Sequence, residues 1–108
     1  MGLFGEPPIV KSARPLLAEV KDNLQAIATG GQIKTAAWDA LKVNGFAVFR
    51  DAPRTDLALD ATYAALRIYV SYCTTAGASP ELIATTQADT TSRLNDLRYR
   101  LEQIINAK

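Results

Sequence analysis

The sequence contains no histidine and a single cysteine, Cys73. Histidine is the commonest general base, the usual partner of a serine or cysteine nucleophile and the commonest zinc ligand, so its absence excludes His-dependent triads and His-based metal motifs. A lone cysteine can form neither an intramolecular disulfide nor a CxxC redox pair nor a thiolate zinc site. We therefore expect no enzyme activity, no catalytic residue, no metal site and no cofactor.

Long apolar runs and an excess of positive charge are absent as well. No stretch approaches the ~20 consecutive apolar residues that a membrane-spanning helix needs. Twelve Lys and Arg stand against eleven Asp and Glu, a formal net charge of +1, whereas a nucleic-acid binder usually carries a basic stripe. We expect neither integral membrane insertion nor nucleic-acid binding, and peripheral membrane contact stays open. The single cysteine fits a reducing compartment, which predicts a cytoplasmic or virion-associated protein.

Apolar residues at spacings of three and four predict the first helix over residues 12–29. Ser12 can cap its N-terminus, and Leu16, Val20 and Ile27 recur along one face. The Gly-Gly pair that follows at 30–31 ends the helix, because glycine adopts the left-handed C′ conformation without a Cβ clash.

The same spacing predicts two further long helices, at 56–76 and 80–106. The first has an inner face of Leu59, Tyr63, Leu66, Val70 and Cys73. The second opens with Ser79-Pro80-Glu81, which combines a capping hydroxyl, a proline at the first helical position and a carboxylate near the positive end of the dipole. A Thr-rich stretch at 85–92 contains poor helix formers and potential caps, so this helix could break there.

Residues 32–50 allow two interpretations. The good helix formers between Thr35 and Leu41 favour a short helix over 32–43 that ends at Asn44-Gly45. Asn-Gly between apolar runs is also the strongest short hairpin signal, and a β-hairpin around 40–50 would be self-consistent. We favour the helix, because an isolated two-stranded ribbon is only marginally stable.

These elements predict an all-α fold, a small antiparallel four-helix bundle. The connections between the helices are a few residues long, which favours antiparallel neighbours. We expect residues 12–108 to form a single helical domain, preceded by an apolar N-terminal arm at 1–11.

Apolar and aromatic residues outside the helical faces, together with one arginine cluster, are candidate contacts for a protein partner. The arm and the stretch after Asn44-Gly45 carry apolar side chains with no obvious place in the bundle, two tyrosines lie near the edge of the third helical face, and two arginines seven positions apart share a face of the last helix. The candidate partner-binding residues are Leu3, Phe4, Phe46, Phe49, Tyr69, Tyr72, Arg93 and Arg100.

Surplus apolar material favours a non-enzymatic protein that acts by protein–protein contact. The first hypothesis is a small structural or adaptor subunit of a larger assembly, homo-oligomeric or viral-particle-like. The alternative is an inhibitor or immunity-type four-helix protein that neutralises a partner such as a bacteriocin–receptor complex. Only chain size and helix order support that alternative, and no residue motif does.

Overall fold

The computed structural model describes residues 6–107 and is all-α over that range. Its elements, in chain order, are α1 (Pro8–Thr29), α2 (Ala36–Lys42), the short 3₁₀ helix η1 (Ala47–Phe49), α3 (Pro53–Thr74) and α4 (Pro80–Asn106). The predicted four-helix bundle is confirmed. No helix in the described part of the chain is both long enough and apolar enough to cross a membrane.

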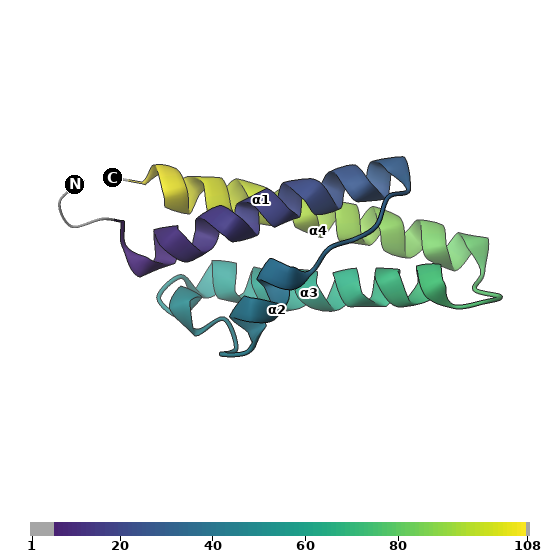
Figure 1. Cartoon of the computed structure of the whole chain (residues 1–108), viewed down its shortest axis with the longest axis horizontal. Helices are drawn as coiled ribbons and strands as arrows, with labels where there is room; N and C mark the ends of the chain where they lie inside the picture. The colour runs from purple at the N-terminus through teal and green to yellow at the C-terminus, as the bar shows by residue number, and fades with distance from the viewer. Residues whose placement is uncertain (1–5, 108) are drawn as a thin grey trace.

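Helix α4 is the central element of the bundle. It packs against both α1 and α3, which run in the same direction and antiparallel to it (Figure 1). The α2–η1 segment carries the chain back between them and packs on α1, with η1 also touching α3. The three long helices form an elongated molecule of 54 × 24 × 20 Å. Its core is made of large apolar side chains with almost no exposed surface: Leu16, Val20, Trp38, Phe46, Phe49, Leu59, Leu66, Leu94, Leu97 and Leu101.

The first helix begins earlier than its predicted start. Pro8 occupies its first turn, where a missing N–H costs no hydrogen bond. Val10 and Ala13 are buried and extend the apolar stripe by one turn toward the N-terminus. The predicted arm at 1–11 is therefore too long, because residues 8–11 belong to α1.

The last helix is continuous, and the break considered within 85–92 does not occur. Its threonines do not cap a new helix. The hydroxyls of Thr85 and Thr86 donate to the carbonyls of Glu81 and Leu82, at 2.9 Å each. Thr90 is buried and its hydroxyl donates across to a carbonyl of α3. The poor helix formers are thus accommodated by hydrogen bonds within the bundle.

Asn44-Gly45 ends a helix and does not turn a hairpin. The Gly45 N–H donates to the Lys42 carbonyl at 2.8 Å and the Phe46 N–H donates to the Leu41 carbonyl at 3.1 Å, with Gly45 at φ 60°. This is the Schellman pattern of a helix C-terminus. No strand is found among residues 6–107, and the apolar stretch that follows forms η1 instead of an extended segment.

Helix α2 is shorter than the predicted 32–43 and is positioned by side chains of α1. The Glu19 carboxylate accepts hydrogen bonds from the backbone N–H groups of Ala37 and Trp38, at 2.8 and 3.0 Å, and so caps α2 from a neighbouring helix. The Asn23 amide donates to the Lys34 carbonyl at 2.8 Å. These hydrogen bonds hold the linker before α2, residues 31–35, in a non-helical conformation, although its sequence permits a helix.

The Asn23 side chain also accepts a hydrogen bond from the Trp38 indole N–H, at 2.9 Å. Asn23 and Trp38 both have no exposed surface. The Trp38 ring lies 5.8 Å from that of Tyr63 and 6.3 Å from that of Phe46. The Tyr63 hydroxyl donates to the Asp39 carboxylate at 2.5 Å, and this hydrogen bond raises the pKa of Tyr63. A buried amide thus fixes the indole, and the other aromatic rings pack around it.

We expect Asn23→Ala to destabilise the protein by about 2–4 kcal/mol, because it leaves the Trp38 indole N–H and the Lys34 carbonyl without partners. Trp38→Phe should cost about 1–3 kcal/mol. In urea unfolding, the double variant should lose about 1 kcal/mol less than the sum of the single changes. The control is Asn95→Ala, an exposed asparagine on α4, which should change stability by less than about 0.5 kcal/mol. Additive losses would contradict the coupling.

Pro15 lies inside α1 because the helix starts at Pro8. It cannot donate the hydrogen bond to the Lys11 carbonyl and its ring crowds that group. We predict that Pro15→Ala raises the free energy of unfolding by about 1–2 kcal/mol, the helix gain being reduced by the greater freedom of the unfolded chain. Pro8→Ala is the matched control and should leave the thermal midpoint nearly unchanged. Equal effects of the two changes would argue against the early start of α1.

Candidate functional site

Three of the candidate partner-binding residues lie in the protein's own core. Phe46 and Phe49 are 1 % and 0 % exposed, and Tyr69 is 8 % exposed. Phe46 adopts a left-handed backbone conformation, with φ 58°, which directs its ring into the aromatic cluster. Burial raises the pKa of the Tyr69 phenol, and the Cys73 thiol beside it adds to the shift. These three side chains are not available to a partner, so their assignment is corrected here.

The remaining candidates have different positions. Leu3 and Phe4 lie outside the described residues. Tyr72 is half-buried near the C-terminal end of α3. Arg93 is exposed and Arg100 is half-buried on α4, and each forms an ion pair one turn back along the helix.

Helix α3 carries a second apolar stripe that faces away from the core. Leu57, Ala61, Ala64 and Ile68 recur at spacings of four, three and four, so they share one face of the helix. Leu57 is 72 % exposed and Ile68 is 48 % exposed. A helix that is apolar on opposite faces is usually buried on both. The outward stripe is therefore the feature of α3 that its own fold does not use.

The inward faces of α3 are already occupied. Leu59, Thr62 and Leu66 point into the core, with Thr62 1 % exposed. Lys42 of α2 forms an ion pair with Asp60 at 2.8 Å, so the α2–η1 segment covers a further side of α3. The stripe lies on the side of α3 that faces away from Leu59 and Leu66, and its Ala61 lies beside residues of α4.

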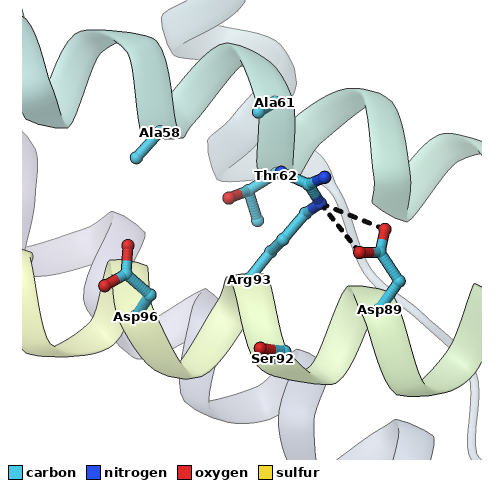
Figure 2. A pocket seen from close by; sticks show the side chains of 7 residues that line it. All are labelled: Ala58, Ala61, Thr62, Asp89, Ser92, Arg93 and Asp96. Atoms are coloured by element: carbon cyan, nitrogen blue, oxygen red, sulfur yellow. Dashed lines mark hydrogen bonds and ion pairs between the residues drawn. The ribbon is translucent and has the colours of Figure 1, made fainter.

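A row of alternating charges on α4 runs alongside this stripe. Arg93 pairs with Asp89 at 3.0 Å, and Arg100 pairs with Asp96 at 2.9 Å. Figure 2 shows Arg93 rising from α4 toward α3, with Asp89 on one side of it and Asp96 on the other. Ala61 from α3 lines the same open groove, which has a volume of about 340 Å³. The apolar stripe and the charged row are therefore parts of one surface.

We call this surface the outer face. It comprises Leu57, Ala61, Ala64 and Ile68 of α3 together with Asp89, Arg93, Asp96 and Arg100 of α4. Its charged groups are neutralised in pairs, and its small alanines leave the backbone of α3 close to the surface. Such a face can dock another helix or a flat protein surface, since it offers an apolar strip with a polar border.

The potential metal ligands within residues 6–107 are dispersed. No group of three or more potential metal ligands occurs among these residues. Asp56 and Asp60 are four positions apart and could have formed a carboxylate pair, but Asp60 is engaged by Lys42. Asp89 and Asp96 are engaged by arginines in the same way.

No protein-family model, curated protein or solved structure matches this chain. The outer face is the surface of the described residues that combines exposed apolar side chains with paired charges.

Leu57 and Ile68 were missed by the sequence analysis, although a signal for them exists. The apolar spacing on α3 predicts an inner face through Leu59 and Leu66, and Leu57 and Ile68 lie outside that face. Residues 57–68 contain two sets of apolar residues at helical spacing. One set includes Leu59 and Leu66, and the other consists of Leu57, Ala61, Ala64 and Ile68. A second register of apolar residues on one helix is the signal that indicates an additional contact surface.

Truncating side chains of the two stripes of α3 should change the stability of the fold to different extents. Leu66→Ala removes a fully buried side chain and should lower the free energy of unfolding by about 2–4 kcal/mol. Leu57→Ala should change it by less than about 0.5 kcal/mol, because this side chain lies largely in water, and the half-exposed Ile68→Ala by no more than about 1 kcal/mol. Chemical unfolding monitored by circular dichroism at low protein concentration measures this. A loss of several kcal/mol for Leu57→Ala would show that the outer stripe serves folding.

Proposed function

We propose that this chain is a non-enzymatic helical protein that acts by protein–protein contact, as a structural or adaptor subunit of a larger assembly. The outer face is its docking surface. Two features support this function. The composition offers few catalytic routes, and α3 exposes an apolar stripe that the core of the bundle does not use.

The observation that carries the proposal is the outward exposure of Leu57 and Ile68 on a single helix face. Full burial of a leucine or isoleucine stabilises a protein or complex by roughly 1.5–3 kcal/mol. Single exposed apolar residues are normal on protein surfaces and carry no meaning alone. Two in one register, joined by Ala61 and Ala64 and bordered by ordered charges, form a continuous strip. A partner helix laid along this strip would bury it.

The chemical groups around the strip favour contact over catalysis. The chain has no histidine to act as a general base near neutral pH. The carboxylates on the outer face pair with arginines, and exposed ion pairs of this kind contribute to orientation more than to affinity. Cys73 is exposed but stands alone at the far end of α3. Rigid helices with fixed charges suit a subunit that is placed in one orientation.

A photo-crosslinking amino acid at position 68 tests the proposal. In the cells that produce the protein, irradiation should link position 68 to another polypeptide, either a second copy or a different protein. Position 43 is the matched control, because Val43 is 81 % exposed and also apolar but lies at the C-terminal end of α2 and is not part of the outer face.

Crosslinks from position 68 that are absent from position 43 would support docking through the outer face. Identical patterns from both positions, or no polypeptide adduct at position 68, would contradict it. Circular dichroism of each labelled protein should show unchanged helix content, since both positions are exposed.

A further inference from the structure

We propose that the outer face pairs with the outer face of a second copy of this chain, in an antiparallel, two-fold symmetric arrangement. This inference rests on the proposed function, since it names the partner of the same surface. It is carried by the order of charges on α4 and by the order of apolar residues on α3.

The charge row of α4 is complementary to itself when reversed. Along the helix the signs run negative at Asp89, positive at Arg93, negative at Asp96 and positive at Arg100. If two copies lie antiparallel about a midpoint between residues 94 and 95, Asp89 of one copy meets Arg100 of the other. Arg93 then meets Asp96. Every charge in the row gains an opposite charge from its partner.

The apolar stripe of α3 is symmetric under the same operation. About a midpoint between residues 62 and 63, Leu57 of one copy meets Ile68 of the other, and Ala61 meets Ala64. The large side chains would stand at the two ends and the small ones at the centre, where two helices must approach most closely. This midpoint also falls near the middle of α3, so the two copies of the helix would overlap along almost their whole length.

The two midpoints lie at nearly the same height in the molecule. The Thr90 hydroxyl donates to the Ala65 carbonyl at 3.3 Å, which fixes how α4 is aligned with α3. Because α3 and α4 are antiparallel, three residues before Ala65 on α3 lie at the same height as three residues after Thr90 on α4. Residue 62 is therefore level with residue 93. The midpoints of the stripe and of the row therefore differ by about 3 Å along the helix axis, two residues at 1.5 Å each. One two-fold axis can serve both.

The direction of the two-fold axis determines which part of the outer face contacts the apolar stripe and the charged row of the other copy. A two-fold axis across the helices places α3 against α3 and α4 against α4, with apolar residues on apolar residues and charges on opposite charges. A two-fold axis along the helices would place the apolar stripe of each copy on the charged row of the other. That arrangement would bury charged side chains against Leu57 and Ile68 with no opposite charge from the other copy, at a cost in free energy. The antiparallel arrangement is favoured.

The size of the surface indicates a reversible dimer. Helix α3 has 22 residues, about 33 Å in length, and two packed helices present a width of about 20 Å, so each copy would cover roughly 600 Å². The total of about 1,200 Å² lies at the lower end of the range for specific interfaces. We therefore expect a dissociation constant in the micromolar range, which a concentration series can resolve.

Charge-order variants of the full-length chain test the pairing while keeping composition and net charge constant. Asp89→Arg with Arg93→Asp leaves opposite charges four positions apart within the helix, but places like charges opposite each other across the two-fold axis. Asp96→Arg with Arg100→Asp does the same from the other end of the row. Sedimentation velocity should show dimerisation of the unmodified protein, weakened about tenfold or more in either variant.

Two recombinations complete the design. Combining all four changes reverses the whole row and restores opposite charges across the axis, so dimerisation should return. An equimolar mixture of the two double variants also pairs every charge with its opposite, so a heterodimer should form although neither variant pairs well with itself. Added salt should weaken the dimer of the unmodified chain and strengthen that of each double variant, since salt screens attraction in the first and repulsion in the second.

A protein that stays monomeric at every concentration would overturn the inference, as would double variants that dimerise as well as the unmodified chain. So would a mixture that fails to recover the dimer. The proposed function fails separately. If position 68 crosslinks to a different polypeptide while the isolated chain is monomeric, the outer face is a docking surface whose partner is not a second copy.

Discussion

The position of the α2–η1 segment depends on the two hydrogen bonds of the buried Asn23 amide. Burial of an unpaired amide is costly, and here both ends of the group are satisfied by one neighbouring segment, through the Lys34 carbonyl and the Trp38 indole. Sliding or rotating α2 by one residue would break both hydrogen bonds. The amide therefore defines a single position for α2, in a bundle whose apolar contacts alone would tolerate several.

The outer face is a consequence of that position. With Trp38 held against α1, the rings of Phe46 and Tyr63 pack around it and the α2–η1 segment covers the side of α3 that carries Tyr63. In a four-helix bundle whose second helix was as long as the others, that helix would bury more of the length of α3. Here α2 has seven residues, and α3 keeps a side with Leu57 and Ile68 exposed, bordered by α4 at Ala61 and by the Lys42–Asp60 ion pair. The short helix thus determines both what is buried and what remains exposed.

The long helices were predictable because their apolar residues repeat locally at three and four. The limits of α2 were not, because they depend on Glu19 and Asn23, which lie many positions earlier in the chain. Phe46 and Phe49 were assigned to a partner since no predicted face had room for them. Only the folded chain shows that the helix end at Gly45 turns them inward. On α3, sequence spacing identifies two apolar faces but does not say which one the bundle covers.

Trp38 is the only tryptophan in the chain, and it lies in the one helix too short to be stable by itself. Its fluorescence therefore reports whether the α2–η1 segment is attached, whereas the far-ultraviolet circular dichroism is dominated by α1, α3 and α4. The two optical signals observe different parts of the same molecule. If the segment detaches before the long helices melt, the two melting curves will separate, and their separation measures the free energy with which the segment is held.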